Sequence, residues 1–133
     1  MLQAYSKGVS VSPNSIYPFN TTSILTGCVA TLNGSTSINL NKPGIYMIEF
    51  NGQASPTGEN GVVSVQLYND GVAMPQANSY AYATMGNPAS LSFSTLIKVG
   101  CLCPCETGSK VLTLHYEGVV GTMDGNIVVT KLR

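Results

Sequence analysis

The sequence predicts an all-β sandwich formed by one domain. Short runs of β-prone residues recur along the chain, clusters of Gly, Pro, Asn and Asp separate them, and no segment shows helical periodicity. The chain has 133 residues, and its hydrophobic content of 44% is enough for a packed core. We therefore expect a single domain over residues 1–133, with its strands arranged in two packed sheets.

Residues before position 41 predict four strand segments. Pro18 confines the second segment to the edge of a sheet, because proline cannot donate a hydrogen bond to a ladder. Asn33-Gly34 is typical of a two-residue hairpin turn and joins the third segment to the fourth. Residues 20–23 are expected to form a polar loop. The four segments are residues 2–11, 16–19, 28–32 and 36–40.

The run from Gly44 to Phe50 predicts a strand with two apolar faces. It follows a Lys42-Pro43-Gly44 turn, where Pro fixes φ and Gly tolerates positive φ. At a period of two, one face carries Tyr46, Ile48 and Phe50, and the other carries Ile45 and Met47 and ends at Glu49. A strand with one face in water should alternate between apolar and polar residues. This strand is therefore expected to be covered on both sides.

The second half of the chain brings the total to about ten strands, which suits a two-sheet jelly roll. Residues 63–68 alternate between apolar and polar side chains, and Asn69-Asp70-Gly71 closes a tight turn after them. Loops are expected at residues 56–61, 85–88, 100–108 and 118–125. The remaining strand segments are residues 72–75, 79–84, 91–99, 110–117 and 126–132.

These strands differ in how many of their faces are apolar. Those beginning at Gly44, Leu91 and Asn126 are apolar or uncharged on two faces, whereas those at Val63 and Lys110 are expected to have one face in water. Charged residues make up 9% of the chain and the net charge is zero, so copies of the chain repel one another weakly. A sheet whose outer face is covered by a symmetric oligomer explains the contrast.

Residues 43–50 resemble a strand of the TNF-like jelly-roll superfamily, which includes the globular heads of complement-type proteins and the C-terminal domains of collagen-like spore-surface glycoproteins. Gly44 and Tyr46 match the Pro-x-x-Gly-x-Tyr-x-Phe-like pattern, Pro43 directly precedes the glycine, and Ile48 stands where an aromatic residue is usual. Residues 66–71, followed by Met74-Pro75, are similar to a strand and turn of the same domains.

Over nearly its full length the chain resembles small proteins encoded by phages and prophages of gut Gram-positive bacteria. The shared features are a Leu-Thr-Gly-Cys strand, a Gly-Ile-Tyr strand, a Cys-rich loop and a terminal Val-Val-Thr-Lys-Leu strand, in this order. The resemblance implies a ten-strand TNF-like sandwich that forms a compact trimer, with its inner sheet facing the three-fold axis. The interface residues expected on this basis are Tyr46, Ile48, Phe50, Leu96 and Val128. A collagen-like stalk and an acidic calcium loop are absent from the sequence.

The four cysteines are Cys28, Cys101, Cys103 and Cys105. They could form one Cys₄ metal site only if Cys28 lay beside the loop, and the single-residue spacings are shorter than zinc sites normally use. A disulfide or a contact between symmetry mates is a second interpretation. Free, partly buried thiols that pack as small hydrophobes are the third, and we expect no metal or cofactor.

His115 and the tyrosines are the remaining candidates for a site. No nucleophile elbow or carboxylate pair accompanies His115, so a surface or interface role is expected and no residue is predicted to be catalytic. Tyr80 and Tyr82 alternate along a weak strand and could stack on sugars, or could belong to the core or an interface. Asp70 is explained by its turn, while Asp124 could shape a connection or hold a cation.

These observations predict a non-enzymatic, homotrimeric structural protein of a virion or surface. It would display residues 56–61, 80–88 and 118–125 for adhesion to a host-surface glycan, or attach to a capsid or tail protein as a decoration protein. The alternative is a soluble, lectin-like carbohydrate-binding module. No basic patch indicates nucleic acid, and no apolar run reaches the ~20 residues of a membrane span. The N-terminus lacks a signal-peptide core, so the expected location is the virion, assembled in the host cytoplasm.

Overall fold

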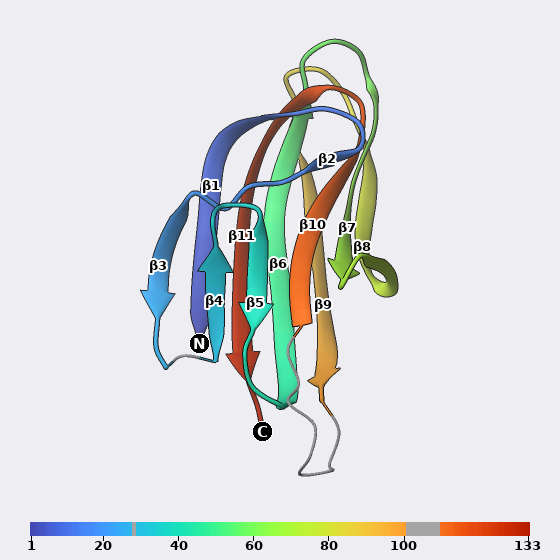
Figure 1. Cartoon of the computed structure of the whole chain (residues 1–133). Coiled ribbons are helices and arrows are strands. Elements are labelled where there is room, and N and C mark those ends of the chain that lie inside the picture. The colour runs from blue at the N-terminus through green and yellow to red at the C-terminus, as the bar shows by residue number, and fades with distance from the viewer. Residues whose placement is uncertain (28, 101–109) are drawn as a thin grey trace.

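The computed structural model describes residues 1–27, 29–100 and 110–133, which form two antiparallel sheets packed face to face (Figure 1). The strands of the described residues are β1 (Leu2–Val11), β2 (Ser15–Ile16), β3 (Thr21–Leu25), β4 (Ala30–Asn33), β5 (Ser37–Leu40), β6 (Gly44–Pro56), β7 (Gly61–Asn69), β8 (Val72–Ala83), β9 (Ala89–Val99), β10 (Lys110–Gly118) and β11 (Gly121–Lys131).

The first sheet has the order β3-β1-β11-β6-β9, and the second has the order β4-β5-β10-β7-β8 with β2 paired to β10. The strands predicted to be apolar on two faces, β6, β9 and β11, are neighbours in the first sheet, which confirms that they form one layer. The two strands expected to have one face in water, β7 and β10, are neighbours in the second sheet. The pattern of apolar faces therefore identified the layer of each of these five strands.

Strand β6 is the centre of the first sheet. It pairs with β11 from Tyr46 opposite Lys131 to Pro56 opposite Gly121, and with β9 from Gly44 opposite Val99 to Ala54 opposite Ala89. Burial alternates along its first half, because successive side chains point to opposite faces of the sheet.

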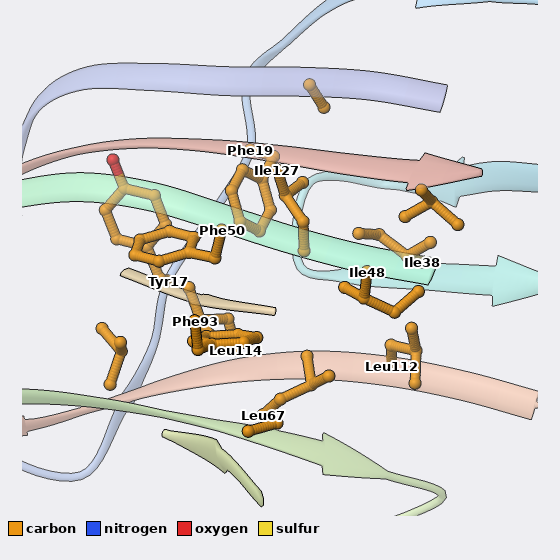
Figure 2. Close-up of a cluster of buried hydrophobic side chains, with 14 of the residues drawn as sticks. Tyr17, Phe19, Ile38, Ile48, Phe50, Leu67, Phe93, Leu112, Leu114 and Ile127 are labelled. Atoms are coloured by element: carbon orange, nitrogen blue, oxygen red, sulfur yellow. The ribbon is translucent and has the colours of Figure 1, made fainter. Parts of the chain in front are cut away.

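The core lies between the two sheets and is filled by side chains from both (Figure 2). Phe50 of β6 stacks on Phe93 of β9 with ring centroids 5.5 Å apart. Tyr17 and Phe19, which follow β2, meet edge to face at 5.3 Å. The buried Tyr17 hydroxyl donates to the carbonyls of Ser6 and Met123, at 3.1 Å each. These two hydrogen bonds tie the chain after β2 to the first sheet.

The described residues form eleven strands, where the sequence predicted about ten. Residues 21–25 form the edge strand β3, although a polar loop was expected at 20–23, because its backbone pairs with β1 while its side chains stay in water. Two separate strands were expected at residues 72–75 and 79–84, but residues 72–83 form the single strand β8, because an edge strand tolerates Pro75.

The pairing of β7 with β8 shifts its register after Gln66. The side-chain amide nitrogen of Gln66 donates to the carbonyls of Met74 and Ala77 at this point.

The predicted loop at 118–125 is also shorter than expected, since β11 already begins at Gly121. The glycines of this segment suggested a turn, but Gly121 and Gly125 lie inside β11, where they allow neighbouring atoms to pack closely against the backbone. A Cβ at Gly121 would lie 2.3 Å from the Ser55 carbonyl oxygen, and one at Gly125 would lie 3.0 Å from the rings of Phe50 and Tyr17. Glycine in a strand often marks such a contact.

Replacing Phe50 by alanine should lower the free energy of unfolding by about 3–5 kcal/mol, because this fully buried ring, which stacks on Phe93, would leave a cavity in the core. Chemical denaturation measures this loss. Val72→Ala is the control, since that side chain is 69% exposed and its truncation should cost less than about 0.5 kcal/mol. Equal losses for the two variants would contradict the assignment of Phe50 to the core.

Alkaline pH should destabilise the fold through Tyr17. Burial, together with the nearby Asp124 carboxylate, raises the pKa of this hydroxyl. The folded chain therefore keeps a proton that the unfolded chain releases near pH 10, so stability is unchanged below about pH 10 and falls above it. Denaturation between neutral pH and about pH 11 should show this fall, reduced in Tyr17→Phe and retained in the exposed control Tyr80→Phe. An unchanged pH dependence in Tyr17→Phe would contradict this role.

Candidate functional site

The two sheets each present an outer face, and the site residues predicted from the sequence divide between these faces and the core. Tyr46, Ile48 and Phe50 are 0% exposed within one chain. Their side chains fill the sandwich and cannot reach a neighbouring subunit, which corrects their assignment to the interface. Leu96 and Val128 point outward, as a role in an interface requires.

One half of the outer face of the first sheet carries four apolar side chains, beside the charged Lys98, which is paired with Ile45, and Glu49. Met47 of β6 is paired with Leu96 of β9, and Leu96 is 58% exposed. Ile45 lies on the same face of β6, two residues before Met47, and Val128 of β11 is paired with Glu49. We call Ile45, Met47, Leu96 and Val128 the apolar patch. In the described residues no helix covers it, because all the regular elements are strands.

The other half of the same face is polar. Tyr5, Asn51, Gln53, Asp124 and Asn126 line a shallow hollow of about 370 Å³. The Asp124 carboxylate accepts the Gly8 N–H at 2.6 Å and the Gln53 amide at 3.3 Å. Asp124 thus stabilises the irregular part of β1, where the register against β11 shifts between Ser6 and Val9. Of the two roles left open for Asp124, these contacts support the one of shaping the backbone.

His115 lies on the outer face of the second sheet, stacked on Tyr68 with ring centroids 3.8 Å apart. A ring nitrogen of His115 lies 3.2 Å from the Thr113 hydroxyl. These partners account for its position as a packing residue. Among residues 1–27, 29–100 and 110–133, no group of three or more His, Cys, Asp or Glu side chains is arranged to hold a metal ion.

Tyr80 and Tyr82 are 76% and 68% exposed on β8, so neither belongs to the core of the chain. Tyr80 lines a hollow of about 420 Å³ on the outer face of the second sheet, together with Ser64, Tyr68 and Glu117, whereas Tyr82 does not line it. The sequence identified the tyrosines but not Ser64 or Glu117. These two belong to the hollow through the pairing of three strands, which no local pattern reveals.

The other candidates have structural roles or lie outside the described residues. Asp70, at the β7–β8 turn, is 3.3 Å from the Lys110 ammonium and accepts the Val111 N–H at 2.8 Å. The four cysteines, and with them the three interpretations of the Cys-rich loop, lie outside the described residues. The described part of the chain contains no helix with the length and hydropathy needed to span a membrane.

Comparison with known proteins supports the fold through structure alone. No protein-family model and no curated protein sequence matches the chain. Among solved structures, the globular domain of zebrafish complement 1qA protein superimposes with a TM-score of 0.72 at 9% identity, covering 99% of this chain and 96% of that one.

Two further solved structures cover the chain almost completely. The PRD1 vertex protein P5 has a TM-score of 0.56 at 17% identity, covering 99% of this chain and 96% of its own. The TNF Eiger from S. frugiperda has a TM-score of 0.58 at 10% identity, covering 99% and 94%. The chain therefore has the TNF-like jelly-roll fold that these proteins share.

Proposed function

We propose that the chain is a non-enzymatic structural protein that assembles as a homotrimer through the outer face of its first sheet and acts on the surface of a virion. The observation that carries this proposal is the apolar patch. An apolar side chain such as Leu96, 58% exposed on the edge strand β9 of the first sheet, gains free energy when a second surface covers it. A copy of the same chain can supply that surface in a closed, symmetric assembly.

Two further observations support this assembly. The resemblance of residues 43–50 to TNF-like domains implies a trimer whose inner sheet faces the axis, and the first sheet contains that strand. The chain also carries only six basic and six acidic residues, so like-charge repulsion opposes association weakly. With Tyr46, Ile48 and Phe50 in the core, the proposed interface consists of the apolar patch.

Four connections gather at one end of the sandwich, at the top of Figure 1: β1–β2, β6–β7, β8–β9 and β10–β11. These are shorter than the loops expected from the sequence, because residues 80–83 and 121–125 belong to strands. A trimer would present three copies of this end together. We assign adhesion or capsid attachment to this end of the sandwich. A role at a particle surface is supported by the structural similarity to a protein named as a vertex protein, PRD1 P5.

Purified particles from the strain that encodes the chain test the virion role. Peptide mass spectrometry should detect the chain in particles separated from free protein, and labelled antibodies should locate it by electron microscopy. Its presence on empty capsids would indicate decoration, and its presence at tail or fibre tips would indicate adhesion. Its consistent absence from washed particles would contradict the virion role in either form.

Leu96→Asp should dissociate the assembly, because burying three carboxylates against Met47 and Val128 costs free energy that Lys98, on the same face of β9, offsets only in part. Light scattering should then give the mass of one chain, 13.9 kDa, with an unchanged circular dichroism spectrum. Val72→Asp is the matched control, since it places the same charge on an apolar side chain that is 69% exposed on the other sheet. If Leu96→Asp kept the mass of the wild type, the apolar patch would not be the interface.

A further inference from the structure

We propose that the hollow on the outer face of the second sheet, between Tyr80 and Glu117, binds a pyranose sugar, either free or at the end of a glycan. We call it the tyrosine groove. All its residues come from one chain, and they lie on the sheet opposite the apolar patch. The inference is therefore independent of the proposed trimer and virion role.

The shape of the tyrosine groove follows from strand register. Ser64 of β7 is paired with Tyr80 of β8 on one side and with Glu117 of β10 on the other. Neighbouring strands lie about 4.8 Å apart, so the backbones at Tyr80 and Glu117 stand about 10 Å apart across one small residue. Ser64 forms a low floor between two taller side chains, and Tyr68 lines the same hollow of about 420 Å³. The opening is wide enough for a single sugar ring.

The chemistry of the two walls suits a sugar. A pyranose has one face of C–H groups, which packs on an aromatic ring, and an edge of hydroxyls, which donate to a carboxylate. Tyr80 is 76% exposed and offers its ring, and Glu117 offers its carboxylate on the opposite wall. Binding sites of this kind combine an apolar surface with a few placed polar groups.

The groove is held in place before any ligand binds. With its side-chain amide turned to face the carboxylate, Asn14 places its nitrogen 2.9 and 2.7 Å from the two Glu117 oxygens. The Ser64 hydroxyl donates to the Glu117 carbonyl at 2.7 Å, and the Tyr68 ring stacks on His115. Groups already fixed in position lose little conformational entropy on binding.

A quaternary ammonium ion is the other ligand that aromatic rings and a carboxylate can attract. The structure favours the sugar, because the Asn14 amide already donates to the Glu117 carboxylate and the floor carries the Ser64 hydroxyl. A hydroxylated ligand can donate to both the Glu117 carboxylate and the Ser64 oxygen, whereas a quaternary ammonium ion has no hydrogen-bond donor for either. Choline chloride is therefore the control ligand.

The test is a titration of the ¹⁵N-labelled chain with methyl pyranosides of glucose, galactose and N-acetylglucosamine, beside a glycan array. We expect amide shifts at Ser64, Tyr80 and Glu117 with a dissociation constant of about 1 mM, or, if only longer ligands bind, signals on the array. Either result supports the tyrosine groove and shows which form of sugar it takes. No shift with any pyranoside and no array signal would overturn the proposal, as would shifts with choline chloride alone.

Matched variants locate the site. Tyr80→Ala removes the aromatic wall, and Ser64→Leu fills the floor, so each should weaken binding by about tenfold or more. Tyr82→Ala is the control, because Tyr82 is equally aromatic and 68% exposed on the same strand but lies outside the groove. Equal losses in Tyr80→Ala and Tyr82→Ala would overturn the proposal. A changed mass of Tyr80→Ala by light scattering would also overturn it, because Tyr80 would then be a subunit contact.

Discussion

The pairing of β6 along both of its edges fixes the rest of the structure. Its partners β11 and β9 follow it over most of its length, so its register cannot shift without breaking two ladders. A slip of one residue would turn Tyr46, Ile48 and Phe50 out of the core and bring Glu49 into it. Gly52 permits this close pairing, because a Cβ there would lie 2.4 Å from the Asp124 carbonyl oxygen.

The same constraint produces the two outer faces. Because Tyr46, Ile48 and Phe50 of β6 point into the sandwich, the alternating residues Ile45, Met47 and Glu49 must face away from it. Ile45 and Met47 of that row lie beside Leu96 and Val128 on the neighbouring strands, and these four residues form the apolar patch. On the second sheet, the short side chain of Ser64 between Tyr80 and Glu117 leaves the tyrosine groove. One chain thus carries a surface suited to its own copies on one sheet and a surface suited to a small polar ligand on the other.

Much of the fold could be predicted from the sequence, because period-two patterns report how many faces of a strand are apolar. They placed β6, β9 and β11 in one sheet correctly. They could not decide which apolar row of β6 points inward, since Tyr46 and Met47 are both apolar and the choice depends on the partners, such as Phe93 stacking on Phe50. The edge strand β3 was missed because its side chains lie in water and leave no pattern. Only the tyrosine side of the tyrosine groove could be predicted from the sequence. Glu117 lies far from Tyr80 in the sequence, and the two residues are brought together by the pairing of both with Ser64.

The central claim is that the exposed apolar patch of one chain is covered by copies of the same chain. Sedimentation equilibrium of the wild-type protein at neutral pH, over a range of dilutions, measures this most directly. The account predicts a particle of three times the chain mass of 13.9 kDa that persists on dilution. A stable species of one chain mass at every concentration would contradict it.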